Sequence, residues 1–179
     1  MNWYLVLKFF HVAAAIAWLG GAGATVFAAA IVPTFEMRKN IIEVVGFLSN
    51  RLFVPSLVLV LVTGLLMWWV GALTFDAWVA WGLAGALLTG GIGATILGPT
   101  AERISKLLEA NASEAEMAPQ MMRLLRAAQA DMVGLTTIVF AMVVKPSWSD
   151  RGLLIAMIVV LVAGASYFLT RPISKAAAA

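Results

Sequence analysis

Cysteine is absent from the 179 residues, and histidine occurs once, as His11. Disulfide bonds, thiolate metal sites, iron–sulfur clusters and covalently attached c-type haem all need cysteine sulfur, so the sequence excludes them. One imidazole per chain cannot provide both axial ligands of a bis-histidine haem. A bound haem would therefore depend on His11 and on a sixth ligand from another source: Met67, Met142, Met157, water or a residue of another chain.

Charge is also scarce. Only 12% of the residues are charged, against about 25% in a typical soluble domain, whereas 63% are hydrophobic and the mean hydropathy is +0.97. This composition predicts an integral membrane protein whose first partner is the lipid bilayer. The net charge of +3 comes from basic residues at the ends of apolar runs, not on one polar face, so we expect no nucleic-acid partner.

The apolar residues fall into runs long enough to cross a bilayer as helices. The predicted fold is all-α, an integral membrane bundle of five transmembrane helices with short amphipathic interfacial helices, in a single membrane domain of residues 1–179. The spans are expected at residues 3–33, 52–75, 78–97, 127–144 and 152–170.

Two amphipathic segments lie between the spans. Residues 36–50 read as a short interfacial helix, and 101–110 continue the third span beyond Pro99 with an amphipathic pattern. Ser113 and Glu116 have the spacing of a capping box, but Pro119 is also a suitable helix start, so the pattern alone leaves the first residue of the next helix open.

The orientation follows from the basic residues, because cytoplasmic loops carry an excess of Lys and Arg. The two long loops and the C-terminal end carry nine of the twelve, and the opposite side carries only Lys8, Lys145 and Arg151. We therefore expect a multi-pass protein of the bacterial inner membrane with its N-terminus outside and its C-terminus in the cytoplasm. The aromatic belt expected at the outer boundary consists of Trp3, Trp68, Trp69, Trp78 and Trp148. The nine basic residues expected on the cytoplasmic side are Arg38, Lys39, Arg51, Arg103, Lys106, Arg123, Arg126, Arg171 and Lys175.

His11 is the first candidate site residue, because ionisable groups inside a membrane are rare and often functional. On a helix it shares one face with Trp18. A neutral imidazole is a ligand for haem iron or copper and also a proton relay, whereas the structural alternative is a hydrogen bond to a carbonyl of a neighbouring helix. Small residues recur every fourth position in the third span, and they allow a helix or a flat ring to approach. The predicted cofactor site therefore joins His11 and Trp18 with Gly82, Ala86 and Gly90.

Two charged residues stand at the ends of spans. Arg51 precedes the second span and Asp131 lies near the start of the fourth, where each charge needs a partner close to hydrocarbon. We predict that they form a structural ion pair; a proton or anion entry site is the functional alternative.

Several segments resemble a known group of proteins. LKFFHVAAAIAWLGG (Leu7–Gly21) and RLFVPSLVLVLVTGLLMWW (Arg51–Trp69) resemble the small bacterial membrane proteins grouped with copper-resistance protein D and the membrane protoporphyrinogen oxidase of haem synthesis. LGPTAERI (Leu97–Ile104) and VFAMVVKP (Val139–Pro146) are most similar to an uncharacterised branch of that group. The resemblance implies a bundle of four or five helices and, for the oxidase branch, haem b bound through His11. The oxidase branch also has a lysine near the start of helix three, and DAWVAWGLAG (76–85) contains none.

Three function classes follow. The first is a b-type haem or porphyrin-linked redox protein, with His11 as the ligand of the haem iron. The second is a non-catalytic accessory subunit of a larger respiratory or photosynthetic membrane complex, and the third is a small transporter. Possible partners are other membrane subunits or further copies of the chain; neither an enzymatic reaction nor a catalytic residue is indicated.

Overall fold

The computed structural model describes residues 2–171, and all regular elements in this range are helical. Five helical stretches are long and apolar enough to cross a membrane, so the predicted all-α class with five spans is confirmed. Lys175 is one of the basic residues on which the predicted membrane orientation depends, and it lies outside the described range. The elements are α1 (Trp3–Ile31), α2 (Phe35–Leu48), η1 (Ser49–Phe53), α3 (Val54–Val70), α4 (Ala77–Ile92), η2 (Gly93–Leu97), α5 (Gly98–Glu109), α6 (Glu114–Val144) and α7 (Arg151–Thr170).

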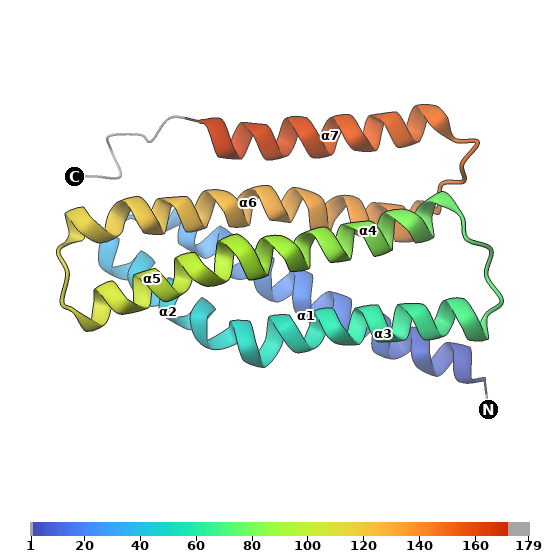
Figure 1. Ribbon diagram of the computed structural model, residues 1–179, viewed down its shortest axis with the longest axis horizontal. Coiled ribbons are helices and arrows are strands. Elements are labelled where there is room, and N and C mark those ends of the chain that lie inside the picture. The colour runs from blue at the N-terminus through green and yellow to red at the C-terminus, as the bar shows by residue number, and fades with distance from the viewer. Residues whose placement is uncertain (1, 172–179) are drawn as a thin grey trace.

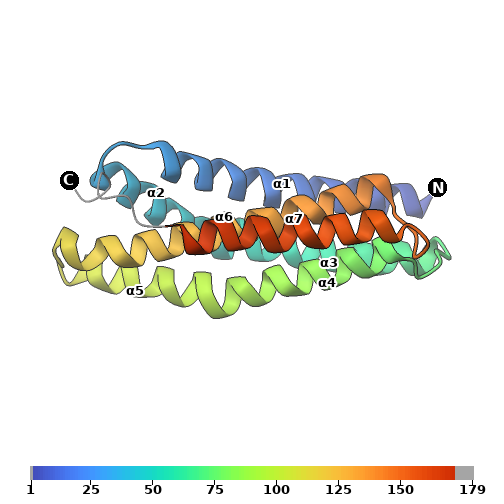
Figure 2. The same cartoon turned by 90° about the horizontal axis from the view of Figure 1, so that it is seen from above.

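The helices run side by side along the long axis of the molecule (Figures 1 and 2). α2, η1 and α3 form one uninterrupted rod, and α4, η2 and α5 form a second. α1 packs closely against α3, α4 packs against α6, and α7 lies on the outside and packs mainly against α6. The amphipathic segments predicted beside the spans are thus continuous with the membrane-crossing helices.

The short connection between α1 and α2 has its polar groups hydrogen-bonded locally. α1 ends at Ile31, before Pro33, as the sequence predicts. The Arg38 guanidinium donates hydrogen bonds to the carbonyl oxygens of Ala29 (3.1 Å) and Val32 (3.2 Å), so it caps the carbonyl end of α1. The Thr34 hydroxyl accepts from the backbone of α2 and starts that helix.

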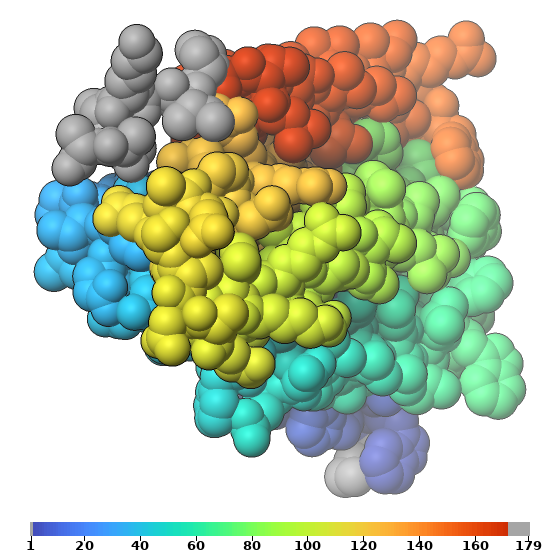
Figure 3. Space-filling model, turned by 60° about the vertical axis from the view of Figure 1, so that its left-hand side comes forward, coloured from blue at the N-terminus to red at the C-terminus, as the bar shows by residue number. Residues whose placement is uncertain are grey.

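An apolar cluster closes the end of the molecule formed by α2, α5 and the first turns of α6. Its buried members come from all three helices and are Ile42, Ile104, Met117, Met121 and Leu124. α6 begins at Glu114, because the Ser113 amide (2.9 Å) and hydroxyl (2.8 Å) both donate to Glu116 Oε2. Figure 3 shows the α5–α6 turn (yellow) beside α2 (blue) at this end. Of the two helix starts left open by the sequence, Ser113 is the cap and Pro119 lies inside the helix.

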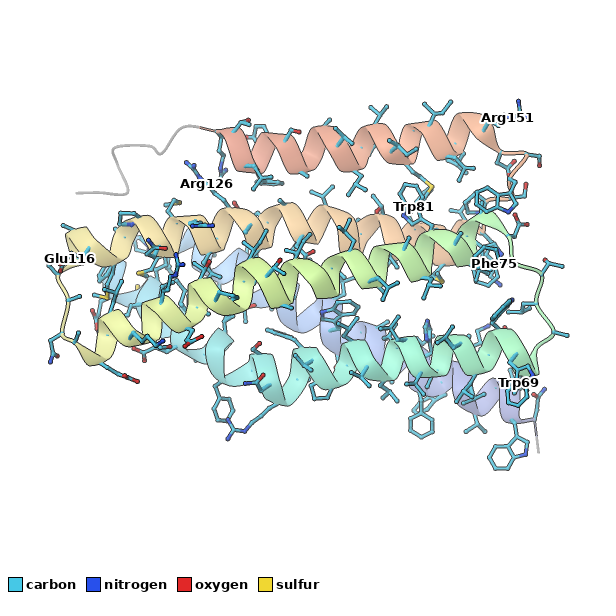
Figure 4. The ribbon with its side chains drawn as sticks, viewed as in Figure 1. Trp69, Phe75, Trp81, Glu116, Arg126 and Arg151 are labelled. Atoms are coloured by element: carbon cyan, nitrogen blue, oxygen red, sulfur yellow. The ribbon has the colours of Figure 1, made fainter. Side chains whose placement is uncertain are left out.

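The opposite end is held by contacts between two loops. Asp76 Oδ1 accepts from the amides of Ala77 (2.7 Å) and Trp148 (3.0 Å), and the Trp148 indole donates to the Phe75 carbonyl (3.3 Å). Figure 4 places Trp69, Phe75 and Arg151 at this end and Glu116 and Arg126 at the other. Trp69 and Trp148, two members of the predicted aromatic belt, therefore lie at the same end of the bundle.

Candidate functional site

A cavity of about 480 Å³ lies inside the bundle. Residues of every helical element except α7 line it, and most of these residues are apolar. The volume falls within the range of about 300–1,000 Å³ typical of small-molecule sites. It is therefore large enough for a ring system or a branched chain.

Both π-helical turns border this cavity. Ser49, Asn50 and Phe53 of η1 line it from one rod, and Gly93, Ala94 and Leu97 of η2 line it from the other. In each turn an amide reaches back five residues, from Val54 to the Ser49 carbonyl and from Gly98 to the Gly93 carbonyl. π-helical turns inside α-helices are rare and occur frequently at functional sites.

Proline explains why both turns are wide. Pro55 and Pro99 each stand second after a π-helical turn, in the related tripeptides VPS and GPT. A proline ring lacks the amide donor and clashes with the carbonyl four residues earlier, which belongs here to Arg51 or Thr95. Each of these residues lies within its π-helical turn, so the wider turn relieves the clash while the helix continues.

Among the residues that the structure describes, Asp131 is the one acidic residue in the cavity wall. It is 9% exposed, and its Oδ1 has no hydrogen-bond partner among the described residues. The Thr89 hydroxyl, which is also in the wall, lies beside the carboxyl group. The described residues of the wall include no Lys, Arg or His, so no positive charge in it balances a negative charge on Asp131.

The predicted pair of Arg51 and Asp131 is not formed within residues 2–171. The Arg51 guanidinium lies 3.9 Å from the centre of the Phe47 ring, and its side chain is exposed. The ion pairs found in this range join Lys39 to Glu36 and Lys106 to Glu102, both on the surface. Arg51 stacks on an aromatic ring of its own helical rod, because η1 directs it outward and not toward α6.

His11 lies outside the cavity, between α1 and α3. Its Nδ1 is 3.0 Å from the Val60 carbonyl and 3.1 Å from the Thr63 hydroxyl oxygen. Thr63 itself donates to the Leu59 and Val60 carbonyls, so Nδ1 carries the proton and donates to Val60. Gly64 permits this contact, because a Cβ there would stand 3.2 Å from His11 Cε1. The bond matches the structural alternative from the sequence and leaves Nε2 as the free nitrogen.

The glycine row of α4 serves mainly as a packing surface for α6. A Cβ at Gly82 would be 1.9 Å from the Met142 methyl group, and one at Gly85 would be 2.5 Å from Ile138 Cγ1. Ala86 is buried, at 3% exposure. Gly90 differs, since it lines the cavity opposite Leu57.

The predicted cofactor residues thus divide into two groups. Trp18 and Gly90 both line the cavity, whereas His11, Gly82 and Ala86 do not. The side chains in the wall that offer a metal donor are few, with Met132 the only thioether and no imidazole. No group of three His, Cys, Asp or Glu residues able to hold a metal lies within residues 2–171. Residues of this kind do not fit a haem inside the cavity.

Sequence reasoning did not identify the cavity itself. One pattern in the sequence indicates the two π-helical turns at its border. In each rod a short segment of polar or small residues is followed by VPS or GPT inside an apolar run. Proline within a continuous helix predicts a local distortion. The charge of Asp131 marks it as a site residue in the sequence, but the pairing predicted with Arg51 leaves no role for the space beside it.

Comparison with known proteins identifies the family of the chain. No curated protein and no solved structure is significantly similar to the chain, so neither copper-resistance protein D nor the protoporphyrinogen oxidase is among its matches. The profile of the family described as predicted integral membrane protein (DUF2269) matches residues 5–146. This range contains the cavity wall and ends just before α7. The chain belongs to this family of predicted integral membrane proteins.

Proposed function

We propose that this protein binds a lipid-soluble small molecule inside the bilayer, in the cavity between the two π-helical turns. The observation that carries the proposal is an apolar space of about 480 Å³ with a single buried acidic group, Asp131, in its wall. Buried polar groups are normally hydrogen-bonded, and the free Oδ1 of Asp131 leaves one bonding site for a ligand. Apolar walls with a few polar groups are typical of small-molecule sites.

The position of the cavity within the family match supports the same proposal. Every lining residue lies between Trp18 and Met132, inside the matched range. α7, which contributes nothing to the wall, lies beyond the match. The feature proposed as functional therefore belongs to the part of the chain that defines the family.

A photoreactive probe tests the binding directly. We expect 4-hexylbenzophenone to label Met132 or Leu57 when the detergent-solubilised protein is irradiated, because both residues line the cavity. Gly93→Leu should abolish this labelling, since Gly93 lines the cavity and a Cβ there meets no atom within 4 Å. Gly91→Leu is the matched control: that position is equally open, but faces away from the cavity.

Two results would contradict the proposal. One is labelling confined to exposed positions such as Val143, which is 76% exposed. The other is equal labelling of Met132 in the Gly93→Leu and Gly91→Leu variants, because a filled cavity cannot admit the probe.

A second candidate function is redox chemistry through haem b held by His11. It is favoured by the bond from Nδ1 to the Val60 carbonyl, because metal-bound histidines usually donate their other ring nitrogen in this way. The site would lie at the α1–α3 contact, outside the cavity. A haem bound there would supply one-electron transfer, and His11 Nε2 would be the atom of this chain that holds its iron.

An absorption spectrum separates the two candidates. For haem, protein purified with ample haem supply should show a Soret band and reduced b-type peaks that disappear in His11→Ala and remain in Lys8→Gln. A colourless wild type that elutes as a single species would eliminate the haem proposal and leave cavity binding unaffected.

We also propose that the protein inhabits the bacterial inner membrane with the α5–α6 turn in the cytoplasm. The support is the separation of charge and aromatic residues between the two ends of the bundle. Arg103, Lys106, Arg123 and Arg126 flank that turn, while Trp69, Trp78 and Trp148 lie at the other end.

A further inference from the structure

We infer that the ligand of the cavity carries a protonated amine on an apolar body, and that Asp131 binds its ammonium group. The inference rests on the proposed binding function and adds the chemical class of the molecule. It is argued from the charge of the site, the shape of its wall and the position of the basic residues.

No side chain among residues 2–171 forms an ion pair with Asp131. The wall holds no basic side chain, and Oδ1 has no hydrogen-bond partner in the described part of the chain. Charged groups within a membrane usually pair with one another, because an isolated charge in an apolar medium costs much free energy. A ligand that brings its own positive charge removes this cost.

No basic side chain forms an ion pair with Asp131 within residues 2–171. Arg51 stacks on the Phe47 ring, and Arg171 donates to Gln129 Oε1 at 2.9 Å. Arg126 precedes Asp131 by five residues on the same helix, which places the two about 140° apart around the helix axis. Arg126 is half-buried, and its Nε has no hydrogen-bond partner among the described residues, so it does not pair with Asp131. Figure 4 shows Arg126 at the α5–α6 end of the molecule. These residues therefore leave the carboxylate free for a cation from outside the chain.

The remainder of the wall suits an apolar body with a positive end. Trp18 and Phe53 line the cavity together with Leu57 and Met132. Aromatic rings attract ammonium groups through their π faces, and the aliphatic residues exclude water. A neutral hydrogen-bond donor would satisfy Oδ1 but would leave the negative charge without a partner, so the site favours an amine over an alcohol of the same shape.

The test compares three probes that differ only in the polar group: 4-hexylbenzylamine, 4-hexylbenzyl alcohol and 4-hexylbenzoate. Binding to the detergent-solubilised protein is measured by titration calorimetry, with protein-free micelles as the reference. We expect the amine to bind at least tenfold more tightly than the alcohol and the benzoate to bind most weakly. Asp131→Asn should bring the amine down to the level of the alcohol, and Asp131→Glu should keep a preference for the amine.

The failures of the inference and of the proposed function are distinct. If the amine and the alcohol bind equally to the wild type, and Gly93→Leu blocks both, the cavity binds a ligand but the amine inference is wrong. If Gly93→Leu and Gly91→Leu bind every probe like the wild type, the cavity is not the site and both proposals are wrong. The comparison of probes on the wild type decides the inference even if Asp131→Asn does not fold.

Discussion

Substituting Gly85 by alanine tests the contact between α4 and α6 with one added methyl group. Gly85 lies in α4, and a Cβ there would stand 2.5 Å from Ile138 Cγ1 and 2.7 Å from Ile138 Cδ1 on α6. Carbon atoms in contact prefer about 3.5–4.0 Å, so the helices must separate by roughly 1 Å or Ile138 must change rotamer. Ile138 resists the second response, because β-branched side chains in helices have one strongly preferred rotamer.

The expected cost is about 1–3 kcal/mol of unfolding free energy, which is the usual range for overpacking in a tight interior. Gly91→Ala is the control in the same helix: no atom lies within 4 Å of an added Cβ there. Alanine is about 0.5–1 kcal/mol better than glycine in a helix, so the control variant should equal or exceed the wild type in stability.

Unfolding of the purified protein in mixed micelles, followed by circular dichroism, gives both free energies. Ile138→Ala alone removes packing and costs stability, but in that background Gly85→Ala should cost less than in the wild type, because the clashing atoms Cγ1 and Cδ1 are gone. The reasoning is refuted if Gly85→Ala is as stable as Gly91→Ala, since the small residues of α4 would then not determine how closely α6 approaches.

Three further results are expected. Arg51→Ala and Asp131→Ala should have additive effects on stability, within about 0.5 kcal/mol, and a larger coupling in a double-mutant cycle would show that the two residues touch. Hydrogen bonds from the Ser147 amide and hydroxyl lower the pKa of Asp150 in the folded protein. The ionised carboxylate should therefore stabilise the α6–α7 turn fully at a pH above the pKa of this group in the unfolded chain. This stabilisation should be lost as the pH falls through the lower pKa of the folded protein. Amide exchange at Ser147 measures the effect, and Asp150→Asn should make the exchange independent of this titration. Cysteine at position 111 should resist a membrane-impermeant reagent in intact cells while a cysteine in the α3–α4 loop reacts, and the reverse pattern would invert the proposed orientation.

The sequence was sufficient for features that depend on hydrophobic length and local chemistry. Apolar runs predicted all five spans because backbone groups in a bilayer must be bonded within a helix. Pro33 ends α1, and the spacing of Ser113 and Glu116 provides the start of α6. These features need no knowledge of which helices are neighbours.

Features that depend on which helices pack against each other were harder to predict from the sequence. Every helix face in a membrane is apolar, so periodicity does not say which helix packs against which. His11 was therefore placed against the glycine row of α4, whereas the structure packs it against Val60 and Gly64 of α3. Asp131 was matched with Arg51 from sequence position alone, and the outward direction given to Arg51 by η1 was not foreseen.

Reaction of Asp131 with dicyclohexylcarbodiimide tests the central claim most directly, because this apolar reagent modifies carboxyl groups that it can reach from the bilayer. Peptide mapping of the folded protein in micelles should show modification at Asp131. Gly93→Leu should suppress it, Gly91→Leu should not, and 4-hexylbenzylamine should protect the wild type. An unmodified Asp131 in the folded wild type, or equal modification in both leucine variants, would contradict a cavity that opens the carboxyl group to apolar ligands.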